Sequence, residues 1–159
     1  NLICNEGYSG KYNGQDYKFE RKIVNQGNPL IYGVDNNELF SLAEDFTNYN
    51  VIRLGNLGRP PTKEQEALEQ TILGKIKKYN GTQIGLEDFR ENYLMYDREY
   101  TRDERSLKSA GETLRVMKET GHNRAFMIYG SNHIDELVPE LNKLGLSVLL
   151  VMYRNNRFR

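Results

Sequence analysis

The chain has 159 residues, enough for one domain with its own core, and its 22 basic and 22 acidic side chains give a net charge of zero. A balanced charge without a basic patch disfavours nucleic-acid binding, and no apolar stretch approaches the roughly 18 residues of a membrane helix. We therefore expect a single soluble domain over residues 1–159.

The amino-terminal end predicts a strand over residues 1–4, followed by a glycine-rich turn that contains Glu6. The only cysteine, Cys4, lies in this apolar run, where we expect a buried thiol. A chain without a cysteine pair suits a reducing, cytoplasmic location. Because the chain starts at Asn1, inside a strand, we expect a fragment of a larger domain that lacks an N-terminal strand or segment. A sheet that lacks one strand has a free edge, so a homodimer is a further prediction.

The next stretch predicts a second strand and a helix. Residues 11–26 show no clear period and are interpreted as loop, with a short helix as the alternative, whereas residues 29–34 predict a strand. Asp35-Asn36-Asn37 can cap a helix that reaches about Phe46. Residues 50–61 contain two glycines and a proline pair, which predict a break in regular structure.

Helical patterns then fill the middle of the chain. Residues 62–79 predict a helix capped by Thr62, and residues 85–96 predict a second helical region. Thr101 or Asp103 caps a third helix, which ends near Gly121. Its inward positions are predicted to be the apolar side chains at helical spacing: Leu107, Ala110, Leu114, Val116 and Met117.

The last part of the chain alternates strands and helices. Residues 125–129 predict a strand covered on both faces, residues 135–144 a helix, and residues 147–152 a last buried strand. The fold class expected from this alternation is α/β, with a largely parallel sheet and helices on both faces. Residues 153–159 are interpreted as a frayed basic tail.

Polar turns follow three of the predicted strands and contain Glu6, Asp35 and His133. Because parallel strands bring their carboxyl ends to one edge of a sheet, we expect these side chains to converge there. Gly130 lets the backbone approach a ligand, so Gly130 and Asp35 are the predicted cofactor-binding residues. Each residue also has an ordinary interpretation: Glu6 as an exposed carboxylate, Asp35 as a helix cap, and His133 as the polar start of a helix.

The C-terminal segment carries the motifs RDER at residues 102–105 and GSNH at residues 130–133. With a strand before GSNH, they resemble the end of the TraB, TIKI, ChaN-like and erythromycin-esterase-like superfamily, which carries a G-x-x-H turn after an Arg-Asp pair. Glu6 and the turn Gly33-Val34-Asp35 resemble the family more loosely. The family's earlier G-x-x-H turn has no counterpart in this sequence, because His122 lies in a helix-to-strand loop.

The resemblance implies hydrolysis of a substrate such as a peptide or an ester. His133 and Glu6 would hold a divalent metal (zinc, manganese, cobalt or iron) that activates water, or His133 would take the proton from water directly. Arg102 would steady an oxyanion or pair with Asp103, and Asp103 would orient the histidine. The predicted catalytic residues are therefore His133, Glu6, Arg102 and Asp103.

Two interpretations without catalysis stay open at this point. ChaN-like relatives suggest haem or iron, held by a histidine or by one of the 11 tyrosines. A sensor or interaction domain that kept the fold and lost the site would carry the same pattern. Arg102 and Asp103 would then be a surface pair with a helix cap.

Overall fold

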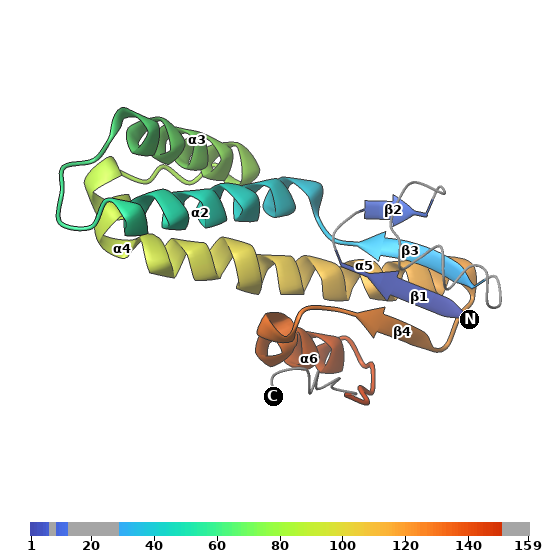
Figure 1. Ribbon diagram of the computed structural model, residues 1–159. Coiled ribbons are helices and arrows are strands. Elements are labelled where there is room, and N and C mark those ends of the chain that lie inside the picture. The colour runs from blue at the N-terminus through green and yellow to red at the C-terminus, as the bar shows by residue number, and fades with distance from the viewer. Residues whose placement is uncertain (7–8, 13–28, 151–159) are drawn as a thin grey trace.

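The computed structural model describes residues 1–6, 9–12 and 29–150. Four strands form one sheet in the order β2-β3-β1-β4 (Figure 1). They are β1 (Leu2–Asn5), β2 (Ser9–Lys11), β3 (Leu30–Val34) and β4 (Ala125–Ile128). β1 pairs in parallel with β3 and β4, whereas β2 pairs antiparallel with β3. The α/β class is confirmed, but the sheet is mixed.

β2 was not predicted, because Ser9–Lys11 carries none of the apolar alternation that marks a strand. β2 is defined by its antiparallel pairing with β3. Just after β2, the backbone N–H of Tyr12 also donates to the carbonyl of Ile31 at 3.0 Å. Most of the predicted loop over residues 11–26 lies outside the described residues.

The helices are α2 (Asn37–Gly55), α3 (Lys63–Asn80), α4 (Leu86–Arg98), the π-helical turn η1 (Glu99–Asp103), α5 (Glu104–Thr120), the 3-10 turn η2 (Ser131–His133) and α6 (Ile134–Lys143). In Figure 1, α4 continues through η1 into α5 as one long helix. The α5 end of this helix lies against the sheet, whereas α2, α3 and α4 extend beyond it. No helix in the described ranges has both the length and the apolar character needed to cross a bilayer.

Several helix ends follow the sequence signals. The side chain of Asn36 accepts from the backbone N–H of Leu39 at 3.0 Å, and Thr62 does the same for Gln65 at 3.2 Å. Gly121 ends α5 in the left-handed conformation, with φ of 69°. One end is different: α2 continues through Gly55, into the predicted break.

The predicted cap at Thr101 or Asp103 is wrong. Asp103 has helical dihedral angles and makes no side-chain capping bond, because the chain enters α5 from η1 without leaving the helix. The Thr101 hydroxyl donates instead to Oδ1 of Asp97, one turn earlier, at 3.1 Å.

Buried side chains form three clusters. The first joins α2, α3, α4 and η1; the second joins α5 to the sheet through Cys4, Val34, Val116 and Met117; the third joins α5 to α6. Burial raises the pKa of the Cys4 thiol to about 11, as fits the predicted core cysteine. Leu107, predicted to face inward, is 45% exposed.

Only one face of the sheet belongs to these clusters in the part of the chain that the structure describes. Strand alternation directs Ile3, Ile31 and Phe126 to the opposite face, and none of them lies in a cluster. Helices on both faces are therefore not confirmed. Phe126 is 60% exposed, so the prediction that this strand is covered on both faces is wrong.

The predicted strand over residues 147–152 is also absent from its described part. Residues 147–150 have no strand structure, and Leu149 is 89% exposed. An apolar run forms a strand only where a neighbouring strand pairs with it. Within the described residues β4 pairs with β1 alone.

Candidate functional site

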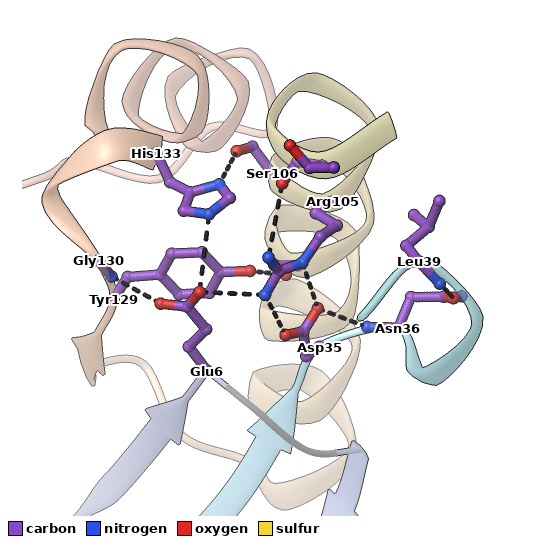
Figure 2. A network of polar contacts seen from close by, with 11 residues as sticks. Glu6, Asp35, Asn36, Leu39, Arg105, Ser106, Tyr129, Gly130 and His133 are labelled. Atoms are coloured by element: carbon purple, nitrogen blue, oxygen red, sulfur yellow. Dashed lines mark hydrogen bonds and ion pairs between the residues drawn. The ribbon is translucent and has the colours of Figure 1, made fainter. Parts of the chain in front are cut away.

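Residues from three strand ends and two helical elements meet at one edge of the sheet (Figure 2). Glu6 follows β1, Asp35 follows β3, and Gly130 lies just after β4. Arg105, in the first turn of α5, and His133, the last residue of η2, complete the group. The parallel pairing of β1 with β3 and β4 brings these carboxyl ends together, as the order of strands and polar turns predicts.

Arg105 links two of the strand ends through its guanidinium group. Its Nε and Nη2 donate to Oδ1 and Oδ2 of Asp35 at 3.2 and 2.5 Å, and Nη2 also donates to Oε1 of Glu6 at 3.0 Å. Burial would lower the pKa of Arg105, but its bonds to Asp35 outweigh this effect and the pKa is raised. Arg105 is therefore a permanent cation that holds both carboxylates in place.

The second oxygen of Glu6 contacts the turn after β4. Gly130 donates its backbone N–H to Oε2 of Glu6 at 2.7 Å. A Cβ atom at residue 130 would lie only 3.2 Å from this oxygen, so glycine permits the close approach. The Glu6 side chain is 26% exposed, which makes it the ionic side chain of the group that water reaches most easily.

His133 is held on both sides of its ring. Nδ1 lies 3.0 Å from Oγ of Ser106, and Nε2 lies 3.6 Å from Oε1 of Glu6. The second separation is too long for a hydrogen bond but close enough for strong electrostatic coupling. The Tyr129 ring packs edge-on against the imidazole, with centroids 5.0 Å apart, and its hydroxyl shares a hydrogen bond with Ser109.

The pKa of His133 is lowered from its ordinary value, chiefly because burial disfavours the charged ring. The negative charge of Glu6 opposes this effect and the positive charge of Arg105 adds to it. The imidazole is therefore neutral at neutral pH, which is the form that accepts a proton.

Replacing His133 by glutamine is expected to remove a pH-dependent part of the stability. In the unfolded chain, His133 binds a proton as the pH falls through its ordinary pKa of about 6.5. In the folded chain its pKa is lowered, so it binds this proton only at lower pH. The wild-type chain therefore loses stability as the pH falls from there through the lowered pKa, and His133→Gln loses less. Urea unfolding at about pH 7.5 and 5.5, with His122→Gln as control, measures this difference. The same loss in wild type and His133→Gln would contradict it.

Two of the predicted catalytic residues do not join this group. Arg102 and Asp103 lie in the π turn η1 and are exposed. Oδ1 of Asp103 lies 3.7 Å from Nε of Arg98 at the surface of the protein. Glu6, Asp35, Gly130 and His133 do come together, and their predicted roles stay predictions.

Arg105 and Ser106 were missed by the sequence analysis. Arg105 belongs to the same RDER motif as Arg102, and residues three apart share one face of a regular α-helix. Here the π turn η1 ends between them, and Arg102 is exposed whereas Arg105 is buried. Ser106 is fully buried beside His133 although its hydroxyl is polar. The available signal was helical spacing from Ser106 to Ala110 and Thr113, a buried stripe that contains small polar residues.

The described residues suit a divalent metal poorly. No group of three or more His, Cys, Asp and Glu side chains gathers in them with metal-binding geometry. Of the two predicted ligands, Glu6 already accepts bonds at both oxygens, and the Arg105 guanidinium lies 3.0 Å from one of them. The positive charge of Arg105 would repel a divalent metal ion bound at Glu6. A typical catalytic zinc also has three protein ligands, whereas only two are predicted here. We therefore derive no step through a metal.

Comparisons with known protein families, with curated proteins and with solved structures find nothing that matches this chain. The resemblance to the TraB and ChaN-like superfamily thus remains a prediction based on the sequence motifs.

Proposed function

We propose that this chain is a hydrolase in which His133 takes a proton from an attacking water beside Glu6. The observation that carries the proposal is the pairing of a buried, neutral imidazole with a partly exposed carboxylate, whose nearest atoms are 3.6 Å apart. A separation of this length leaves Nε2 without a hydrogen-bond partner among the described residues. In the tautomer that carries its N–H on Nδ1, Nε2 has a free lone pair that can receive a proton.

The chemistry follows from the charges around the ring. Nε2 takes one proton from water while the water oxygen forms a bond to the acyl carbon of an ester or peptide. The bond from that carbon to the leaving oxygen or nitrogen then breaks, and His133 gives the proton to the leaving alcohol or amine. Glu6 stabilises the imidazolium that forms in the transition state, because a carboxylate attracts a positively charged ring more strongly than a neutral one. Arg105 and Gly130 hold Glu6 in position for this contact.

The test is hydrolysis of p-nitrophenyl acetate, p-nitrophenyl butyrate and peptide p-nitroanilides by the full-length chain. His133→Ala is expected to lower kcat/KM by about 10²- to 10⁴-fold, the usual contribution of a general base. His122→Ala, which removes the other histidine, is the matched control and keeps the wild-type rate. Equal rates for wild type and His133→Ala would refute the role of His133.

Two further arms separate the alternatives from the same sample. Activity is expected to survive EDTA, because no step uses a metal. A loss on chelation that zinc or manganese reverses would instead restore the predicted metal site. A wild-type chain that hydrolyses none of the substrates but gives a Soret band with haemin would be a haem-binding protein. Neither activity nor binding would favour the interaction domain.

A further inference from the structure

The first turn of α5 holds both members of the pair formed by His133 and Glu6. Arg105 donates from Nη2 to Oε1 of Glu6 at 3.0 Å. The next residue, Ser106, places its Oγ 3.0 Å from Nδ1 of His133, while the other ring nitrogen, Nε2, lies 3.6 Å from Oε1 of Glu6 (Figure 2). Ser106 is fully buried on α5, so its hydroxyl does not meet a substrate and acts on the ring alone.

Packing around the imidazole is compatible with two orientations of the ring. A histidine side chain can turn by about 180° about its Cβ–Cγ bond and fill nearly the same space. The turn exchanges Nδ1 with Cδ2 and Nε2 with Cε1. The edge-on contact with Tyr129, with 5.0 Å between centroids and 87° between ring planes, fixes the plane of the His133 ring, and this plane is the same in both orientations. Packing therefore does not decide whether a nitrogen or a carbon faces Glu6.

The Ser106 hydroxyl distinguishes the two orientations, because it contacts Nδ1 in one of them and a carbon atom in the other. A hydrogen bond between Oγ and Nδ1 forms whichever of the two atoms carries the proton. In the turned ring the hydroxyl would face Cδ2 and lose its one hydrogen-bond partner among the described residues. Because a buried hydroxyl without a partner is unfavourable, the contact favours the orientation in which Nε2 faces Glu6.

We propose that Ser106 is a positioning residue that selects the orientation of the His133 ring in which Nε2, and not Cε1, faces Glu6. In the turned orientation a carbon atom would stand where the proposed reaction needs a proton acceptor. Arg105 and Ser106, adjacent in sequence, thus set the positions of the carboxylate and of the imidazole from one helical turn. This inference rests on the proposed function, but the orientation of the ring is measured without it.

The test is proton NMR of the His133 ring in the full-length chain at neutral pH, with His122→Gln to assign the two histidines. A Cβ atom at residue 130 would lie 3.8 Å from Cδ2 of His133, so an α-proton of Gly130 faces Hδ2. We expect a nuclear Overhauser effect between these two protons in the wild type. In Ser106→Ala we expect it to weaken, and a contact between Hδ2 and the new methyl group at residue 106 to appear.

Ser109→Ala is the matched control, because it removes an equally buried hydroxyl of α5 that bonds to Tyr129 and not to the imidazole. It should leave the contact between Hδ2 and Gly130 at wild-type strength. A wild-type ring without this contact, or a Ser106→Ala ring with the contact unweakened, would overturn the inference. Should Ser106→Ala not fold, Ser106→Cys replaces it. A thiol bonds more weakly than a hydroxyl, so the contact should weaken there too, and an unweakened contact would again overturn the inference.

Hydrolysis assays connect the orientation to the reaction. Ser106→Ala is expected to lower kcat in proportion to the share of rings turned away from Glu6, by about 2- to 10-fold, with little change in KM. An active chain whose Ser106→Ala variant turns the ring and keeps the wild-type kcat would overturn the positioning role. The expected ring orientation in a chain that hydrolyses nothing would reject the proposed function and leave the selection of orientation by Ser106 standing.

Discussion

Replacing Arg105 by methionine is expected to destabilise the folded protein by about 3–5 kcal/mol, the usual cost of removing one partner from a buried ion pair. Asp35 is 2% exposed and would lose the two guanidinium hydrogen bonds that compensate its buried charge. Glu6 would lose the bond to Oε1 and hence part of its alignment with His133. Hydrolysis should fall together with stability, because the same cation serves both.

Two matched variants separate charge from geometry at this position. Arg105→Lys keeps the cation but cannot form the two-pronged contact with Asp35, so an intermediate loss is expected. The double variant Arg105→Met with Asp35→Leu removes both buried charges and should recover most of the stability, without recovering hydrolysis. Urea unfolding gives the free energies. A loss below about 1 kcal/mol in Arg105→Met would show that water already screens the pair.

The convergence of Glu6, Asp35 and His133 was predictable because it follows from strand order alone. Each residue comes just after an apolar run, and parallel strands end at one sheet edge. The cation that joins them was not predictable in the same way. RDER offers two arginines, and only the direction of each on the helix tells Arg105 from Arg102. That direction depends on the π turn before α5, for which the sequence carried no recognised signal.

Hydrophobic periodicity also assigned the wrong face to part of α5. It placed Leu107 inside, whereas the buried stripe contains Ser106, Ser109 and Thr113. These hydroxyl groups are buried because they have partners: His133 for Ser106, Tyr129 for Ser109, and a backbone carbonyl for Thr113. A pattern that counts apolar side chains overlooks a helix face directed at a polar site.

Other differences arise where structure depends on distant partners. Helix α2 continues through residues 50–55 although glycine and proline signals predicted a break. Arg53 supports this extension, since its Nη1 donates to the Tyr93 hydroxyl at 2.8 Å and its guanidinium lies 4.1 Å from the centre of the Tyr93 ring. Local propensity is a weak signal, and contacts of this kind override it.

Replacing Arg90 by methionine is expected to cost a similar 3–5 kcal/mol, in the helical part of the chain away from the site. Glu69 is fully buried, and Arg90 donates to both its oxygens, from Nε at 3.0 Å to each and from Nη2 at 2.6 Å to Oε2. Tyr49 donates a further bond at 3.0 Å, and burial, followed by the charge of Glu69, raises the pKa of Tyr49 to about 12. Without Arg90, neutral donors alone would face the buried carboxylate.

The reverse substitution at this pair should be milder. Arg90 is 33% exposed at its side chain, so water can solvate the guanidinium in Glu69→Gln, and a loss of about 1–2 kcal/mol is expected. Arg90→Met with Glu69→Gln should be less destabilised than Arg90→Met alone, since no buried charge remains. Equal losses for the two single variants in urea unfolding would contradict this asymmetry. Because Tyr49 of α2 and Glu69 of α3 contact α4 and not the sheet edge, folded Arg90→Met should hydrolyse substrate at the wild-type rate. A lower rate in folded Arg90→Met would mean that the helical cluster and the site are one coupled unit.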